Sequence, residues 1–180
     1  MSKIWKTRST EVLLKRPPWF EVFVEEVELP GGEIVSDYHQ IHMPHYTAAF
    51  AVTQDQKIMV MRCYRHAVGE VTLTMPGGMV EVEEDPIAGI KRELLEETGY
   101  IAHEWQSLGT FLGNSTRGCG TYHLFFARGA HQIQPPDSGD LEEMELLLWK
   151  KSDVETAIEK GKVKSLGVIT LLLLGLRCLK

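Results

Sequence analysis

Residues 78–100, which read GMVEVEEDPIAGIKRELLEETGY, decide both the fold and the chemistry of this chain. They carry the signals that begin and end a helix. Asp85 is a suitable N-cap, and Pro86 follows at the first helical position, where the missing N–H of proline costs nothing. Gly99 suits the left-handed backbone conformation that ends many helices. The sequence therefore predicts a helix over residues 86–98.

One face of the predicted helix is acidic. Glu93, Glu96 and Glu97 are spaced i, i+3 and i+4, so their carboxylates project from the same side. The opposite face carries aliphatic residues that can pack against a sheet, namely Ile87, Ile90 and Leu94. A carboxylate cluster on a rigid helix, beside a glycine-rich turn with bare carbonyl groups, suits a hard cation such as Mg²⁺.

A solvated acidic face is the alternative, and for an arbitrary helix with three glutamates it is the commoner explanation. Two observations favour the cation site. Arg92 is spaced to form an ion pair with Glu96 at i+4. In addition, the residues around the cluster match a long fixed pattern.

That pattern is the Nudix box, G-x5-E-x7-R-E-U-x-E-E-x-G-U, where U is a bulky aliphatic residue. The chain resembles it without a gap, and the seven fixed residues coincide with Gly78, Glu84, Arg92, Glu93, Glu96, Glu97 and Gly99. Tyr100, in the final apolar place, is the one departure, and it occupies a packing position. The resemblance implies an α/β fold, the α/β/α sandwich with a mixed β-sheet.

The resemblance also implies roles for individual residues. Five residues correspond to the metal site, four through carboxylates and one through its main-chain carbonyl: Glu93, Glu96, Glu97, Glu84 and Gly77. Arg92 resembles the residue that orients these ligands through a salt bridge. The implied cofactor is Mg²⁺, with Mn²⁺ as a substitute, and the implied reaction is attack of water on one phosphorus of a diphosphate.

Outside the box, residues 20–178 resemble the ADP-ribose pyrophosphatase branch and its nucleoside diphosphate sugar relatives. Residues 62–67, RCYRHA, are similar to that branch's R-Q-Y-R-x-A, with Cys63 in place of glutamine. Residues 75–78, MPGG, stand where the branch has L-P-A-G. Arginine can bind phosphate through two parallel hydrogen bonds, which suits Arg65 and, with less support, Arg62. Surface charge at a strand end is the alternative for both.

An acidic loop follows at residues 140–143. In the resembling branch this loop holds a catalytic or metal-binding carboxylate, and Glu142 is the first candidate here, followed by Asp140 and Glu143. A solvated loop is an equally good explanation, because sequence alone does not show which carboxylate reaches the attacking water.

The resemblance divides the chain into an N-terminal β-arm, residues 1–40, and a Nudix hydrolase domain, residues 41–180. In the branch such an arm reaches across to a partner subunit, so we expect a homodimer with the arm in its interface. Trp19 and Phe20 are candidates to stack on the base of the substrate. Core packing is the more ordinary role for both.

Hydrophobic patterns and turn residues predict the remaining elements. Strands are expected at residues 20–29, 46–53, 57–64, 72–75, 105–111, 121–127 and 144–150, with a return strand beginning at 33–35. Ser152 and Glu155 have capping-box spacing for a helix that ends at Gly161, and a last helix is expected over residues 165–179. Such an order is typical of a mixed sheet covered by helices.

Bulk composition narrows the function. The 180 residues include 25 acidic and 19 basic ones, a net charge of −6, which gives no support to nucleic-acid binding. The longest apolar run, residues 168–176, is too short to cross a bilayer, so no membrane association is expected. Three widely spaced cysteines and the absence of an apolar leader indicate reduced thiols in a cytoplasmic protein.

The leading hypothesis is therefore hydrolysis of ADP-ribose or a related nucleoside diphosphate sugar to a nucleoside monophosphate and a sugar phosphate. One alternative is a pyrophosphatase for another nucleotide, such as a nucleoside triphosphate or a dinucleoside polyphosphate. Another is a module that binds nucleotides without cutting them. The retention of all the metal carboxylates of the box argues against that last alternative.

Overall fold

The computed structural model describes residues 3–137, 139 and 143–179. The chain divides into two compact units. The smaller contains Met1–His45 with Leu112–Thr121, and the larger contains Tyr46–Phe111 with Tyr122–Lys180.

The smaller unit contains an antiparallel three-stranded sheet in the order β1-β2-β3, formed by β1 (Lys6–Arg16), β2 (Phe20–Glu28) and β3 (Ile34–His42). The strands β2 and β3 and the turn between them agree with the sequence. The strand β1 was not predicted, because all of its residues are exposed and none need be apolar for burial. Ion pairs join β1 to β2, from Arg8 to Glu28 and from Lys15 to Glu21.

The larger unit is built on a mixed eight-stranded sheet, whose strands β9 and β10 also contribute residues to the smaller unit. The main order is β11-β5-β4-β10-β8, while β6 pairs with β5, β7 with β4 and β9 with β10. The strands are β4 (His45–Thr53), β5 (Ile58–Arg65), β6 (Glu70–Thr74), β7 (Gly77–Met79), β8 (Tyr100–Ile101), β9 (Glu104–Asn114), β10 (Cys119–Gln132) and β11 (Glu145–Trp149).

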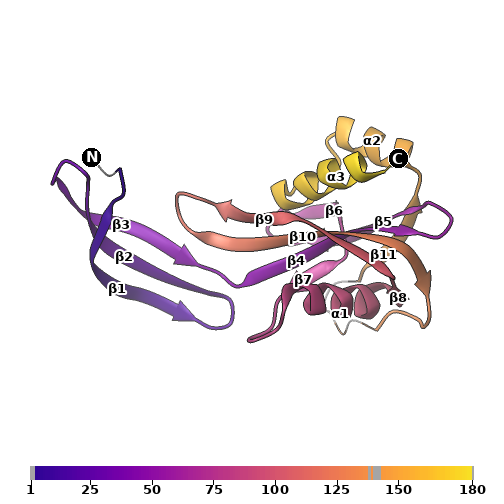
Figure 1. Cartoon of the computed structure of the whole chain (residues 1–180), viewed down its shortest axis with the longest axis horizontal. Coiled ribbons are helices and arrows are strands. Elements are labelled where there is room, and N and C mark those ends of the chain that lie inside the picture. The colour runs from indigo at the N-terminus through magenta and orange to yellow at the C-terminus, as the bar shows by residue number, and fades with distance from the viewer. Residues whose placement is uncertain (1–2, 138, 140–142, 180) are drawn as a thin grey trace. The chain divides into compact units, whose positions relative to one another are not determined.

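Helices cover both faces of this sheet. The helix α1 (Pro86–Thr98) lies on one face, and α2 (Lys151–Glu159) and α3 (Leu166–Cys178) lie on the other (Figure 1). The sequence of β4 explains why both faces are covered. Its side chains alternate between the two faces, and both sets contain apolar residues. Ala49 and Ala51 pack with α1, whereas Phe50 and Val52 belong to the cluster that includes α2 and α3. The predicted α/β/α sandwich is confirmed.

The ends of α1 agree with the sequence. The Asp85 carboxylate accepts a hydrogen bond from the Ile87 N–H at 3.1 Å. Gly99 has φ 74°, and its N–H donates to the Leu95 carbonyl oxygen at 2.7 Å. A Cβ atom on Gly99 would lie 1.9 Å from the Gln134 carbonyl oxygen, so close packing as well as backbone conformation requires glycine.

The predicted capping box of α2, from Ser152 to Glu155, is wrong. The helix begins earlier, and the N–H of Lys150 donates to the Asp153 carboxylate at 3.0 Å. The last helix begins after Ser165 as predicted. Within the described residues, no helix has both the length and the apolar character needed to span a bilayer.

Candidate functional site

Arg92 is the centre of the network formed by the residues of the box. Its guanidinium has five N–H donors, and all five are used. Two donate to the two carboxylate oxygens of Glu84, both at 3.1 Å, and two donate to Glu93 at 2.8 Å and to Glu96 at 3.0 Å. The fifth donates to the Met79 carbonyl oxygen at 3.3 Å. The arginine therefore holds three carboxylates and the turn before α1 in one arrangement.

This network sets the protonation of its members. Hydrogen bonds from Arg92 lower the pKa of Glu84, and a further hydrogen bond from the Glu81 N–H, at 3.0 Å, acts in the same direction. Hydrogen bonds to the carboxylates, led by the pair with Glu84, raise the pKa of Arg92. Both changes favour the charged forms, so Glu84 and Arg92 form an ionised pair near neutral pH.

Glu97 is held separately. This residue is buried, with a relative exposure of 9%. Its carboxylate accepts a hydrogen bond from the Gly77 N–H at 2.7 Å. This bond joins the acidic face of α1 to β7, which pairs with β4. The glycine-rich turn thus contacts the carboxylate cluster directly.

Gly78 gives the cluster its space. A Cβ atom at this position would lie 2.5 Å from the carboxyl carbon of Glu93, so any side chain there would displace that carboxylate. The first glycine of the box is therefore explained by close approach of a carboxylate to the backbone.

The donor set fits a hard divalent cation. The acidic face offers only oxygen ligands, and the Glu93 side chain is 14% exposed while that of Glu96 is 42% exposed. Among the described residues, no three His, Cys, Asp or Glu side chains already form a metal-binding group. Mg²⁺ in phosphate sites commonly takes part of its coordination from water and substrate.

A cavity of about 430 Å³ has Gly77 and Gly78, which lie against Glu97 and Glu93, in its wall, but none of the carboxylates of α1 lines it. Two basic side chains line it, Arg65 from β5 and Lys164 from the segment before α3. The Lys164 ammonium lies 3.4 Å from the Glu70 carboxylate. We call this space the substrate cavity, because it joins basic groups to the edge of the acidic cluster.

The substrate cavity also has an aromatic wall. Tyr46 and Tyr122 stack with ring centroids 5.4 Å apart, and both line the cavity. Burial, with the neighbouring Tyr122, raises the pKa of Tyr46, so its phenol is neutral at physiological pH. Sequence reasoning missed these two residues and Lys164. They come from strands and a loop far apart in the chain, and no local signal marks them.

The other residues singled out from the sequence lie in different places. Arg62 forms an ion pair with Glu145 and lines a second cavity, although it is only three residues from Arg65. Asp140 and Glu142 lie outside the described residues, and Glu143 is exposed. In the smaller unit, Trp19 lies in the turn before β2 and Phe20 is the first residue of β2, and both side chains are exposed.

Two family models match the chain. The NUDIX domain model matches residues 43–166, and the nucleoside diphosphate sugar hydrolase N-terminal domain model matches residues 5–41. Together they cover most of the three-stranded sheet and the sandwich up to the first residue of α3.

Several known proteins are similar in sequence or fold. The chain is 36% identical over 117 residues to the CMP-5'-(N-acetyl-N-hydroxy-3-aminopropyl)phosphonate hydrolase of Streptomyces rubellomurinus, a match that covers 64% of this chain and 55% of that protein. It is 28% identical over 139 residues to the ADP-ribose pyrophosphatase of Bacillus subtilis, covering 77% of this chain and 74% of the relative. A crystal structure of an ADP compounds hydrolase has a TM-score of 0.84 at 15% identity, covering 97% of this chain and 94% of that one, which shows a common fold.

Proposed function

Because the chain belongs to the Nudix family, we propose that it is a hydrolase for the diphosphate bond of ADP-ribose or a related nucleoside diphosphate sugar, with Mg²⁺ as cofactor. The products would be a nucleoside monophosphate and a sugar phosphate. The observation that carries the proposal is the carboxylate network around Arg92, which lies against Gly77 and Gly78, two residues in the wall of a cavity with two basic side chains. The match of residues 5–41 and the ADP-ribose pyrophosphatases among the relatives support this substrate class.

Members of the family generally use divalent metal ions. We assign the ion here to Glu93, Glu96 and Glu97, with the Gly77 carbonyl and Glu84 as supporting groups. When bound, a divalent ion polarises phosphoryl oxygens and lowers the pKa of water. Arg92 fixes the positions of Glu84, Glu93 and Glu96 through hydrogen bonds, and Mn²⁺ would substitute because it accepts the same oxygen ligands.

Other residues of the chain would bind the substrate. Arg65 and Lys164 would neutralise the diphosphate, and the stacked Tyr46 and Tyr122 offer a flat wall to the sugar or base. In the reaction the oxygen of a water molecule bonds to one phosphorus, the bridging P–O bond breaks, and the leaving phosphate keeps the bonding electrons.

We propose that a carboxylate of the acidic loop accepts the proton of the attacking water. Glu142 is the first candidate for this base, Asp140 the second and Glu143 the third. A base there must come within hydrogen-bond reach of the water. Single glutamine or asparagine variants of the three residues would identify it, since only the true base should change the acid limb of the pH–rate profile.

We further propose that the chain is a homodimer in which residues 1–40 contribute to the interface. The smaller unit exposes large apolar side chains, including Val12 and Leu13 of β1 and Trp19 of the turn before β2, and exposed apolar side chains of this size are common at interfaces. Light scattering would give the oligomeric state. A rise in KM for Trp19→Ala or Phe20→Ala with little change in kcat would support a role for the arm in holding the base.

The reaction is tested by incubating the enzyme with ADP-ribose and Mg²⁺ and separating the products by chromatography. We expect AMP and ribose 5-phosphate, and an almost complete loss of rate in Glu97→Gln. Glutamine can still accept the hydrogen bond of the Gly77 N–H, so the fold should persist. The matched control is Glu83→Gln, an exposed neighbour outside the network, which should retain the wild-type rate.

Full activity in Glu97→Gln would contradict the metal assignment. A panel with a nucleoside triphosphate, a dinucleoside polyphosphate and a CMP-linked phosphonate tests the substrate class. Preference for one of these over ADP-ribose would keep the hydrolase but replace the proposed substrate.

A further inference from the structure

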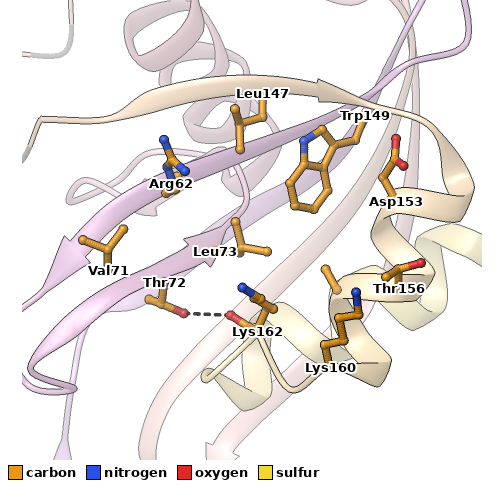
Figure 2. A pocket seen from close by; sticks show the side chains of 11 residues that line it. Arg62, Val71, Thr72, Leu73, Leu147, Trp149, Asp153, Thr156, Lys160 and Lys162 are labelled. Atoms are coloured by element: carbon orange, nitrogen blue, oxygen red, sulfur yellow. Dashed lines mark hydrogen bonds between the residues drawn. The ribbon is translucent and has the colours of Figure 1, made fainter.

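A second cavity, of about 650 Å³, lies among β5, β6, β11 and the end of α2 (Figure 2). It contains none of the carboxylates of α1. It borders the substrate cavity, since Thr72 and Leu73 of β6 line both. Its volume is in the range of about 300–1,000 Å³ that is usual for small-molecule sites.

The walls of this cavity are basic, although the protein as a whole carries a net charge of −6. Arg62 lines it from β5, and Lys160 and Lys162 line it at and after the end of α2 (Figure 2). Asp153 is the acidic residue of the lining, and its carboxylate already accepts a hydrogen bond from the Lys150 N–H at 3.0 Å.

The two lysines are the available cations. Arg62 is partly neutralised by its ion pair with Glu145. Within residues 3–137, 139 and 143–179, neither Lys160 nor Lys162 forms an ion pair. The Lys162 carbonyl oxygen accepts a hydrogen bond from the Thr72 hydroxyl at 3.3 Å, which ties this segment to β6 (Figure 2). This hydrogen bond fixes the backbone of Lys162, while its ammonium group has no acidic partner among the described residues.

An aromatic and apolar surface completes the cavity. The indole of Trp149 is half-buried and lines the wall formed by β11, and Leu73 and Leu147 lie in the same space (Figure 2). An indole provides a large flat face that can stack on another ring, and it does so without a high cost in conformational entropy. The cavity therefore combines a ring-binding surface with paired positive charges.

We infer that this cavity binds a small phosphate monoester that carries an aromatic ring, as a nucleoside monophosphate does, with the ring against Trp149 and the phosphate near Lys160 and Lys162. The inference rests on the cavity alone and holds whether or not the proposed hydrolysis takes place. Because lysines rather than a metal ion hold the phosphate, binding requires no divalent cation.

The test is calorimetric titration of the full chain with AMP in the presence of EDTA, which suppresses any metal-dependent binding in the substrate cavity. We expect the wild-type protein to bind AMP, and the Lys160→Gln/Lys162→Gln variant to bind it at least about tenfold more weakly, since two charge-assisted contacts are lost. The control is Lys151→Gln, which removes a lysine of α2 that pairs with Glu155 and does not line the cavity.

Two measurements locate the ligand. AMP should quench tryptophan fluorescence in the wild type, and Trp149→Phe should remove most of that change while keeping an aromatic ring in the wall. Lys164→Gln, in the substrate cavity, should leave AMP affinity in EDTA unchanged. No AMP binding by the wild type, equal affinity in the double lysine variant, or weakening by Lys164→Gln alone would each overturn the inference.

Discussion

Replacing Arg92 by lysine tests the network at its centre. The substitution keeps one positive charge but removes the planar group that donates five hydrogen bonds to Glu84, Glu93, Glu96 and Met79. An ammonium group has three donors, so at least two of the five bonds are lost. A hydrogen bond to a charged group contributes about 1.5–3 kcal/mol. The Arg92 side chain is 27% exposed, and solvent screening reduces that figure.

We therefore expect Arg92→Lys to lower the free energy of unfolding by about 2–4 kcal/mol. Arg92→Gln should cost more at neutral pH, because three carboxylates then face one another without a cation. Its deficit should shrink as the pH falls and Glu84, whose pKa Arg92 lowers, becomes protonated, and also when Mg²⁺ is added. Urea unfolding followed by circular dichroism, first in EDTA and then in Mg²⁺ without EDTA, measures these differences. The control is Arg16→Lys, since Arg16 is exposed and donates to a neighbouring carbonyl.

The result that refutes this reasoning is a free energy of unfolding for Arg92→Lys within about 0.5 kcal/mol of the wild type, which is the usual effect of a surface substitution. A deficit in Arg92→Gln that does not change with pH or Mg²⁺ would also contradict it. Either outcome would mean that the carboxylates are compensated by solvent rather than by the guanidinium.

Three further predictions concern single positions. Gly78→Ala should weaken Mn²⁺ binding in calorimetry, because the added Cβ occupies the place of the Glu93 carboxylate; unchanged affinity would contradict the close approach. Glu84 has a lowered pKa in the folded protein, so its stabilisation is complete above its ordinary pKa of 4.5 and is lost as the pH falls below it. Urea unfolding at pH 3–7 without metal should show less acid-induced loss in Glu84→Gln than in the wild type, and parallel curves would contradict this. Gly99→Ala should lower the melting temperature clearly more than Gly161→Ala, since both have positive φ but only the first meets a backbone oxygen; equal shifts would mean that crowding is unimportant.

Local signals explain why the sequence predicted α1 and its acidic face so well. Asp85 and Gly99 determine the helix ends through hydrogen bonds within a few residues, and the helix periodicity alone places Glu93, Glu96 and Glu97 on one side. The α2 cap was wrong because two overlapping pairs, Ser152 with Glu155 and Lys150 with Asp153, have the same spacing, and the second pair forms the hydrogen bond.

Contacts between distant segments were beyond local reasoning. The i+4 spacing predicted the pair of Arg92 with Glu96, but the bonds to Glu84 depend on the turn that returns residues 79–85 towards α1. The stacked Tyr46 and Tyr122 meet only because β4 and β10 are neighbours in the sheet. The position of β5 in the sheet likewise determines that Arg65 lines the substrate cavity while Arg62 lines the second cavity.

The most direct test of the account is binding of Mn²⁺ to the protein without substrate, measured by the electron paramagnetic resonance signal of the free ion. The wild type and Glu83→Gln should both bind Mn²⁺, and Glu93→Gln/Glu97→Gln should bind it at least about tenfold more weakly, because it loses two charged oxygen ligands. Equal Mn²⁺ affinity in that double variant and the wild type would contradict the claim that the acidic face of α1 holds the cation.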